Sequence, residues 1–498
     1  MSKRPAELPE SETDPRKNGE RPSNIQNDGD ASDFEDEYED EYESEDEIFE
    51  AGVDGRPDEE REAEEREDAM DVDQDTFIVG RNRLAAGETL APDLSTYQML
   101  HTLESPWPCL SFDIVRDNLG DNRKSYPATV YAVAGTQAAR GHEKENQLMV
   151  MKLSSLSRME REHEEDSDEE SDDESADPIL ETKSIPLTST TNRIRAFQSP
   201  QATSARPPTT LTASMMESGQ VLIHDVTPHL TSFDTPGTTI TPQQNKPLYT
   251  IGAHKRSEGY AVDWSPHVPE GRIATGDADG RIFITTRAPN GSFSTDSAPF
   301  TGHTGTVEEI QWSPSDKTTF ASGGNDGYVR VWDTRSKSHK PALSVPVTST
   351  DVNVLSWSRQ TSHLLASGHE DGEWAVWDLR QWRTAAQAQK GANTISRPEP
   401  VASFTFHKEQ ITSLEWHPTE DSIVLVGAGD NTLTLWDLAV ELDDEESRDT
   451  AGVKDVPPQL LFVHYMEMVK EGHWHPQIPG TVMATGGSGF GVFKTISV

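Results

Sequence analysis

Residues 302–333 read GHTGTVEEIQWSPSDKTTFASGGNDGYVRVWD, and this stretch determines the fold class of the chain. It begins with Gly-His, carries Trp-Ser-Pro ten residues on and ends with Trp-Asp, which together are typical of one WD-repeat unit. Its short apolar runs alternate with polar residues, as strands with one buried face do. Gly327 follows Asn325 and Asp326 in a tight turn, because Gly accepts positive φ and Asn and Asp tolerate it. Such a unit cannot bury its apolar faces alone, so it predicts neighbours.

Four side chains of this stretch have the types and spacing of a hydrogen-bond network within one blade. They are His303, Ser322, Asp326 and Trp332. A buried polar network stabilises a fold only if every member is satisfied. We therefore expect a structural role for these four residues.

Six less regular copies of the unit follow the same register and predict an all-β fold, a seven-bladed WD-repeat β-propeller over residues 105–498. The fifth copy has no Gly-His at its start, and the first is degenerate. Successive core tryptophans are 48, 45, 59 and 58 residues apart, so insertions fall between blades. These tryptophans are Trp264, Trp312, Trp357, Trp416 and Trp474.

The seventh copy supplies only three strands, so another segment has to close the ring. Closure removes the exposed sheet edges of a propeller. The alternating segment 110–115 reads as a strand that belongs to no blade. We expect it to be the outer strand of the seventh blade.

The segment 76–104 precedes that strand and is predicted to contain a helix within 88–104. Apolar residues and one histidine recur there at near-helical spacing. They are Leu94, Tyr97, Leu100, His101 and Leu103. We expect the helix to pack on the last blade.

The formal charge of −44 is concentrated in two segments. Residues 1–80 hold 31 Asp or Glu against 8 Lys or Arg, and the insertion 153–178 holds 12 against 2. Residues 1–75 are too polar to offset the entropy of ordering, so they are expected to form a disordered acidic tail. Residues 31–50 interleave 12 acids with aromatic side chains, which fits a solvating tail or a mimic of nucleic acid that holds a basic protein. The candidate contacts are Asp33, Glu35, Asp36, Glu37, Glu39, Asp40, Glu41, Asp166, Asp168, Glu169 and Glu170.

The remaining composition favours a soluble, intracellular protein. No apolar run approaches the roughly 18 residues of a spanning helix, and the first residues lack the apolar core of a signal peptide. Cys109 is the single cysteine, which excludes an intramolecular disulfide. Basic pairs at 3–4 and 16–17 have the spacing of a bipartite nuclear signal.

Catalytic motifs are missing from the sequence: it has no phosphate loop, no GxSxG elbow and no HExxH helix. His464, His473 and His475 suggest a metal site or simple packing. Packing is favoured because no cysteine or suitably spaced acid accompanies them. We expect no enzyme activity, cofactor or metal.

The order of parts resembles the histone-binding WD-repeat family, the retinoblastoma-binding histone chaperones, and within it the glutamate-rich WD-repeat branch. The resemblance covers about residues 76–498 and includes Gly259-Tyr260 before Trp264 and the acidic loop 441–460, which ends in PPQL. CLSFDIVRDNLGDNR (109–123) and AGTQA (134–138) point to the branch.

This resemblance implies a groove between the N-terminal helix and the Pro-Pro loop that holds a helix of a basic client. One wall would be Leu94, Tyr97, Leu100 and His101, and the other Asp443, Asp444, Glu445, Glu446, Pro457 and Pro458. The alternative is that the loop acids only keep a long loop solvated.

For function, the resemblance implies a monomeric, non-enzymatic chaperone of the nucleus and nucleolus that acts in large-subunit ribosome biogenesis. The implied client is large-subunit ribosomal protein L-three, delivered to pre-ribosomal particles without direct nucleic-acid binding. A histone chaperone is the alternative within the family.

Short motifs suggest one more function for the protein and its regulation by phosphorylation. Arg335 and Arg380 follow Trp-Asp-x and resemble the boxes by which propellers dock onto cullin ubiquitin-ligase adaptors, although either can pair with its own strand-end carboxylate. Ser32, Ser44, Ser167 and Ser171 each have an acid three residues on, as acidophilic kinases require.

Overall fold

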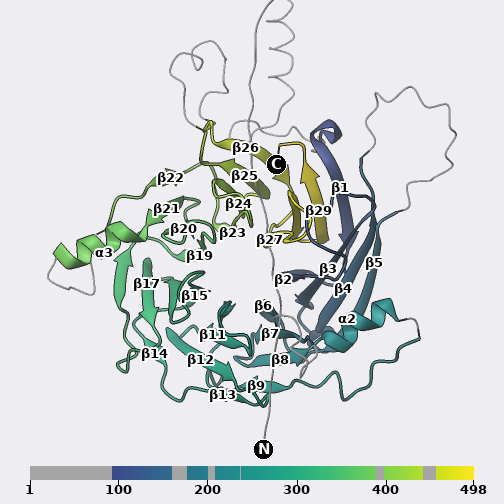
Figure 1. Ribbon diagram of the computed structural model, residues 1–498, viewed down its shortest axis with the longest axis horizontal. Coiled ribbons are helices and arrows are strands. Elements are labelled where there is room, and N and C mark those ends of the chain that lie inside the picture. The colour runs from purple at the N-terminus through teal and green to yellow at the C-terminus, as the bar shows by residue number, and fades with distance from the viewer. Residues whose placement is uncertain are drawn as a thin grey trace, which may run out of the picture. The chain divides into compact units, whose positions relative to one another are not determined.

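The fold is described from a computed structural model. It describes residues 92–159, 177–199, 208–235, 237–388, 397–440 and 456–497, all within one compact unit, Phe77–Val498. These residues form seven antiparallel sheets arranged as blades around a ring (Figure 1). The predicted fold class, an all-β seven-bladed propeller with WD repeats, is confirmed. The expected acidic tail 1–75 lies outside the described residues.

Each of the first three blades begins at the strand nearest the ring centre. Blade one contains β2 (Cys109–Val115), β3 (Ala128–Thr136), β4 (Gln147–Leu156) and β5 (Ile179–Pro186). Blade two contains β6 (Thr191–Gln198), β7 (Thr210–Met216), β8 (Val221–Asp225) and β9 (Tyr249–Ile251). Blade three contains β10 (Ala261–Trp264), β11 (Arg272–Gly276), β12 (Arg281–Arg287), β13 (Phe293–Thr295) and the short β14 (Phe300–Thr301).

The next three blades repeat the same meander. Blade four, the clearest repeat in the sequence, contains β15 (Val307–Trp312), β16 (Thr319–Gly324), β17 (Tyr328–Asp333) and β18 (Leu343–Pro346). Blade five contains β19 (Val352–Trp357), β20 (Leu364–His369), β21 (Trp374–Asp378) and β22 (Ala402–Phe404). Blade six contains β23 (Ile411–Trp416), β24 (Ile423–Ala428), β25 (Thr432–Asp437) and β26 (Leu460–Tyr465).

Blade seven combines the two ends of the described chain. It contains β27 (Glu471–Trp474), β28 (Thr481–Thr485), β29 (Gly489–Thr495) and, as its outer strand, β1 (Tyr97–Glu104). Figure 1 shows β1, in purple, beside β29, in yellow. An N-terminal strand therefore closes the ring.

Two predictions about this closure are wrong. The described part of the predicted helix within 88–104 is a 3₁₀ turn, η1 (Leu94–Thr96), followed by β1. Tyr97, Met99 and Leu103 are buried at the even spacing of a strand, whereas Leu100, which suggested a helical stripe, is only half-buried. The segment 110–115 belongs to β2, the inner strand of blade one, and not to blade seven.

The burial of β2 explains why it cannot be an outer strand. Five of its seven residues are buried, and they point to both faces of the sheet. The outer strand β5 of the same blade has one buried residue in eight. An inner strand is enclosed by the blades on either side, so nearly continuous apolar character is expected there.

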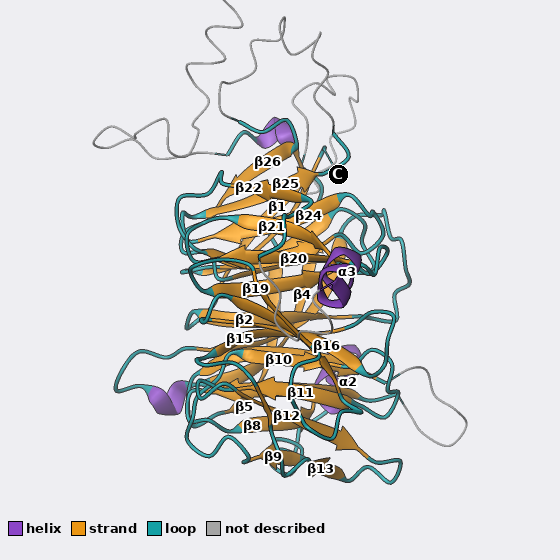
Figure 2. Cartoon of the chain, turned by 90° about the vertical axis from the view of Figure 1, so that its left-hand side faces the viewer, coloured by secondary structure: helices purple, strands orange, loops and turns teal. Residues whose placement is uncertain are grey.

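Few helices accompany the strands. α2 (Thr227–Asp234) and α3 (Leu379–Ala388) follow the third strands of blades two and five, and η2 (Glu143–Glu145) is a single 3₁₀ turn. Figures 1 and 2 place α3 on the outer rim of the ring. In the described part of the chain, neither α-helix has the length and apolar character needed to cross a bilayer.

The core of the described propeller consists of seven apolar clusters, one at each junction between adjacent blades. Both faces of every sheet are therefore buried against neighbours. The cluster between blades six and seven includes Tyr97 of β1. Packing of the closing strand thus extends to the preceding blade as well as to its own sheet.

Candidate functional site

The surface around β1 brings together segments that are far apart in the sequence. We call it the seam and define it by residues 94–104, 157–159, 456–465 and 489–497. It lies where blades six, seven and one meet. The six described residues that were predicted to line a client groove all fall within these ranges.

Tyr97 lies beneath this surface and does not line it. Its ring packs against Phe462, His464 and Phe493, and its hydroxyl is 2.8 Å from Nδ1 of His464. Only 5% of Tyr97 is exposed. Burial lowers the pKa of His464 to about 4, so the imidazole is neutral and available for this hydrogen bond at neutral pH. Tyr97 therefore supports the seam from within.

β1 also holds the start of the acidic insertion. The backbone N–H of Met159 donates to the carbonyl of Gln98 at 2.9 Å, and Nε2 of His101 is 2.9 Å from the carbonyl of Ser157. The next residue, Glu160, begins the acidic run that lies outside the described residues, with Asp166, Asp168, Glu169 and Glu170 in it. His101 thus has a definite role at the seam, although as an anchor for a neighbouring segment.

The acidic loop 441–460 starts and ends at the same place. Nε2 of Gln459 donates to the carbonyl of Val440 at 3.0 Å and ties the two ends together. Phe462 packs in one apolar cluster with Tyr97, Leu100 and Met159. Pro457 is half-buried and Pro458 is exposed. The loop acids Asp443, Asp444, Glu445 and Glu446 lie outside the described residues.

These attachment points share one topological position. The insertion joins the third and fourth strands of blade one, and the loop joins the third and fourth strands of blade six. In blade seven the same position is open, because its fourth strand is β1, which follows the N-terminal segment. The segments 1–91, 160–176 and 441–455 carry net charges of −22, −10 and −5, or −37 of the formal −44. The sequence predicts acidic segments, and the topology shows that their attachment points are adjacent.

Apolar side chains are exposed beside these attachment points. Leu94 is 51% exposed and Ile496 is 49% exposed, and the N–H of Ile496 donates to the carbonyl of Thr96 at 3.1 Å. Ile179, the first residue after the insertion that lies in a strand, is also half-exposed. Exposed apolar groups beside acidic segments can accept an amphipathic basic helix.

The four predicted network residues of blade four are brought together. Ring nitrogens of His303 lie 3.1 Å from Asp326 and 2.7 Å from the hydroxyl of Ser322, which accepts a 2.8 Å hydrogen bond from the indole of Trp332. Arg330, which was not among the predicted residues, also pairs with Asp326 at 2.8 Å. Its position in β17, four residues after Asp326 in the preceding turn, is the available signal. Burial opposes ionisation of Asp326, but its hydrogen bonds to His303 and Arg330 hold its pKa well below the usual range.

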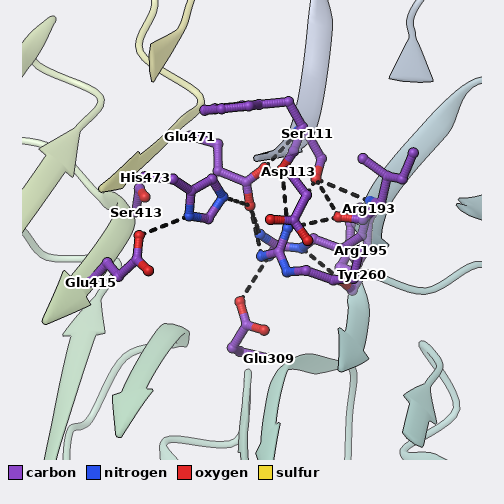
Figure 3. A network of polar contacts seen from close by, with 12 residues as sticks. Ser111, Asp113, Arg193, Arg195, Tyr260, Glu309, Ser413, Glu415, Glu471 and His473 are labelled. Atoms are coloured by element: carbon purple, nitrogen blue, oxygen red, sulfur yellow. Dashed lines mark hydrogen bonds and ion pairs between the residues drawn. The ribbon is translucent and has the colours of Figure 1, made fainter. Parts of the chain in front are cut away.

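A second polar network, absent from the sequence predictions, lies on the inner strands (Figure 3). We call it the central ion cluster. Its members are Asp113, Arg193, Arg195, Glu309, Glu415, Glu471 and His473. They come from blades one, two, four, six and seven. A buried cluster that joins five blades at the ring centre is well placed to hold the ring closed.

Glu471 is the centre of this cluster. Its carboxylate accepts hydrogen bonds of 2.8 Å from the N–H of Phe112, from Arg193 and from Arg195. Burial opposes ionisation, but Arg195 and His473 hold the pKa of Glu471 well below its ordinary value. Burial likewise opposes protonation of His473, but Glu471 and Glu415 raise its pKa to about 10. Both groups are therefore charged at neutral pH, and the cluster is a structural ion network.

The three histidines considered as metal ligands have separate roles. His464 bonds to Tyr97, and His473 pairs with Glu415 at 2.9 Å. Nδ1 of His475 accepts from the backbone N–H groups of Gln477 and Ile478. The three rings thus serve three different local contacts.

One group in the described part of the chain has the composition of a metal site: His369, Asp371 and Glu373, whose candidate ligand atoms lie within 4.8 Å of one another. Its position suggests a structural origin. Blade five lacks the Gly-His histidine, and Nε2 of His369 is 2.8 Å from the hydroxyl of Ser367, which accepts from Trp377. His369 thus makes the contact that His303 makes in blade four.

The two arginines of the adaptor-like boxes pair with their own strand ends. Arg335 lies 2.8 Å from Asp333, and Arg380 lies 2.7 Å from Asp378. Both side chains remain exposed, at 71% and 67%. The candidate tail contacts, from Asp33 to Glu41, and the candidate phosphosites Ser32, Ser44, Ser167 and Ser171 lie outside the described residues.

Two known protein families match parts of this chain. The family of the histone-binding protein RBBP4, which also covers a component of the CAF1 complex, matches residues 87–157, which include β1 and the start of the insertion. The WD domain, G-beta repeat, matches residues 295–333 and 398–437.

Three curated proteins are similar to this chain over most or all of its length. The chain is 44% identical to ribosome assembly protein rrb1 of Schizosaccharomyces pombe, over all of both chains. It is 41% identical to protein HEAT STRESS TOLERANT DWD 1 of Arabidopsis thaliana, over 84% of this chain and 91% of that protein. It is 37% identical to glutamate-rich WD repeat-containing protein 1 of Dictyostelium discoideum, over 84% of each.

Proposed function

Because the chain belongs to the family of the ribosome assembly protein rrb1 and the glutamate-rich WD repeat-containing proteins, we propose that it acts in ribosome biogenesis as a non-enzymatic chaperone of a basic protein. The observation that carries this proposal is the seam, where the attachment points of three acidic segments are adjacent to exposed apolar side chains.

The chemistry of the seam suits a basic amphipathic client segment. Apolar client residues would contact Leu94, Leu100 and Ile496, while client Lys and Arg would pair with Asp443, Asp444, Glu445 and Glu446 beside Pro457 and Pro458. The tail and the insertion add diffuse negative charge. Dense charge raises the rate of encounter with a basic partner, and the attraction is screened by salt over about 10 Å at 0.1 M.

Our proposed client is large-subunit ribosomal protein L-three, held before its delivery to pre-ribosomal particles. A highly basic protein that has to be kept from RNA and from aggregation matches an acidic chaperone. The proposed place of action is the nucleus and nucleolus, with shuttling to the cytoplasm, and the chaperone acts as a monomer that does not bind nucleic acid directly. Similarity to a ribosome assembly protein supports the pathway.

The test is a binding titration of purified L-three against the full chain at several salt concentrations. Affinity is expected to fall as salt rises. Deletion of 31–68, or replacement of 160–176 or 441–455 by a Gly/Ser linker of equal length, is expected to weaken binding about tenfold and to flatten the salt dependence. The matched control replaces 389–396, which contains no acidic residue.

The apolar part of the seam has a separate readout. Leu94→Ser with Ile496→Ser removes exposed apolar contacts and no charge, so it is expected to weaken binding without changing the salt dependence. Equal affinity for core histones and L-three at matched salt would contradict the client preference and favour the histone-chaperone alternative. Unchanged binding in every acidic-segment variant would contradict the proposed chemistry itself.

Docking on a cullin ubiquitin-ligase adaptor is the second candidate function. It rests on the exposure of Arg335 and Arg380 at equivalent strand ends of blades four and five. Capture of a cullin adaptor from nuclear extract that is lost in the Arg335→Ala, Arg380→Ala variant would support it. Because both arginines already pair with neighbouring aspartates, failure of the variant to alter capture would leave them with that local role.

A further inference from the structure

A basic hollow lies between blades three and four, outside the seam. Its volume is about 470 Å³, and its walls include His267 and Arg272 of blade three and Lys317 and Arg335 of blade four. Three of the eight lining residues are Lys or Arg and none is acidic. The whole chain has 87 Asp and Glu against 43 Lys and Arg, so this composition departs sharply from the chain average.

The cations of this hollow are incompletely paired. Nε of Arg272 is buried and has no hydrogen-bond partner among the described residues. In that same part of the chain, Arg272 and Lys317 form no ion pair, whereas Arg335 pairs with Asp333. A buried N–H of a guanidinium that lacks an acceptor is unfavourable. An oxyanion that enters the hollow would pair with the charged groups of Arg272 and Lys317, and arginine is suited to carboxylate and phosphoryl groups.

A second hollow, of about 490 Å³ and with a mixed polar and apolar lining, continues from the basic one. The two share residues 267–269, and the second is also lined by Phe197, Trp264 and Pro266. Phe197 and Trp264 stack with ring centroids 5.1 Å apart, and both are largely buried beneath the hollow. The hydroxyl of Ser265 is buried beside it and has no partner within the described ranges. Together the hollows form a groove with a cationic end and an aromatic end.

We propose that this groove binds an extended peptide segment of a partner protein, with an acidic or phosphorylated side chain at Arg272, Lys317 and Arg335 and an apolar side chain over Trp264. A single oxyanion beside an apolar residue matches both ends of the groove. A nucleic acid fits less well, because tracking a polyanion needs a row of cations, whereas the cations of this groove gather at one end.

The groove lies on the same face of the ring as the attachment points of the acidic segments. Its walls come from connections between first and second strands and between third and fourth strands, which leave a four-stranded meander at the same end. Blades three and four lie across the ring from blade seven (Figure 1). The groove thus favours an acidic partner, whereas the seam favours a basic one. The proposal for the groove therefore does not depend on the proposed function.

The test uses short fluorescein-labelled peptides and the full chain. Three peptides differ only at the centre, with phosphoserine, Glu or Ser beside a Phe, and a fourth replaces that Phe with Ala. Fluorescence anisotropy is expected to show binding of the phosphoserine and Glu peptides, with the Ser peptide at least about tenfold weaker. Loss of the Phe is expected to weaken binding as well. The phosphoserine and Glu arms distinguish the two sources of the oxyanion.

Lys317→Glu is expected to weaken the acidic peptides about tenfold or more. The matched control is Lys337→Glu, which makes the same charge change at an exposed position outside the groove and is expected to have little effect. Circular dichroism checks that both variants keep the fold. The proposal is overturned if neither acidic peptide binds, if Lys337→Glu has the same effect as Lys317→Glu, or if a single-stranded oligonucleotide displaces the peptides at lower concentration than the unlabelled peptide does.

Discussion

Replacing Glu471 with Gln tests whether the central ion cluster stabilises the closed ring. The substitution keeps the size of the side chain but removes a buried charge that accepts three hydrogen bonds of 2.8 Å. Arg193, Arg195 and His473 would then share only the remaining carboxylates of the cluster. Removing one partner of a buried ion pair typically costs about 3–5 kcal/mol, because the other charge stays buried. We expect a loss of that size in the free energy of unfolding.

The assay is urea unfolding followed by tryptophan fluorescence, with the free energy taken from the midpoint and the slope. The matched control is Glu467→Gln in the same blade, an exposed position where the change is expected to stay within about 0.5 kcal/mol. A loss below about 1 kcal/mol for Glu471→Gln would refute the conclusion that this carboxylate organises the cluster. A midpoint shift with an unchanged slope would indicate a stability effect alone.

Three further predictions address other contacts. Because the pKa of His473 is raised to about 10, protonated His473 stabilises the fold fully below about pH 6.5, and this stabilisation is lost as the pH rises through about 10. His473→Asn is therefore expected to flatten the loss of stability across that pH range. An equally steep loss in the variant would contradict this prediction. Tyr97→Phe removes the hydrogen bond to His464 and is expected to lower the free energy of unfolding by about 1 kcal/mol; no change in urea unfolding would mean that this bond contributes nothing. Ser322→Ala leaves the indole of Trp332 without its acceptor and is expected to cost about 1–3 kcal/mol by the same measurement, and a neutral result would show that the blade-four network is dispensable.

Short sequence patterns within the repeats predicted most of the fold. Blade four is defined by features within 32 residues, such as the turn at Asn325 to Gly327, and its register identified the less regular copies. β1 was harder to predict, because Tyr97, Leu100 and Leu103 match a helical stripe while Tyr97, Met99 and Leu103 match a strand. Only the unpaired edge of β29 decides between them. That edge is a tertiary feature.

The candidate site also combines features that are visible in the local sequence with contacts between residues that are far apart in the sequence. Acidic segments and the Pro-Pro loop are visible in composition, whereas the contact of His101 with the carbonyl of Ser157 joins residues 56 positions apart. The central ion cluster could not be predicted, because Glu471 and Arg193 are 278 residues apart and nothing in either local sequence identifies the other. The same applies to Arg272 and Lys317, which belong to different repeats and meet only at a blade junction.

Ring closure by β1 and β29 has a consequence for synthesis. Thr102 pairs with Gly491, roughly 390 residues later in the chain. At about 5–20 residues per second, β1 waits roughly 20 to 80 s before its partner strand has been made. Throughout that interval its backbone groups are a free sheet edge that can pair with other chains. The final assembly step is therefore a long-range closure, slow by its contact order. A nascent chain that stops before Gly489 would keep an open ring, however well its first six blades have folded.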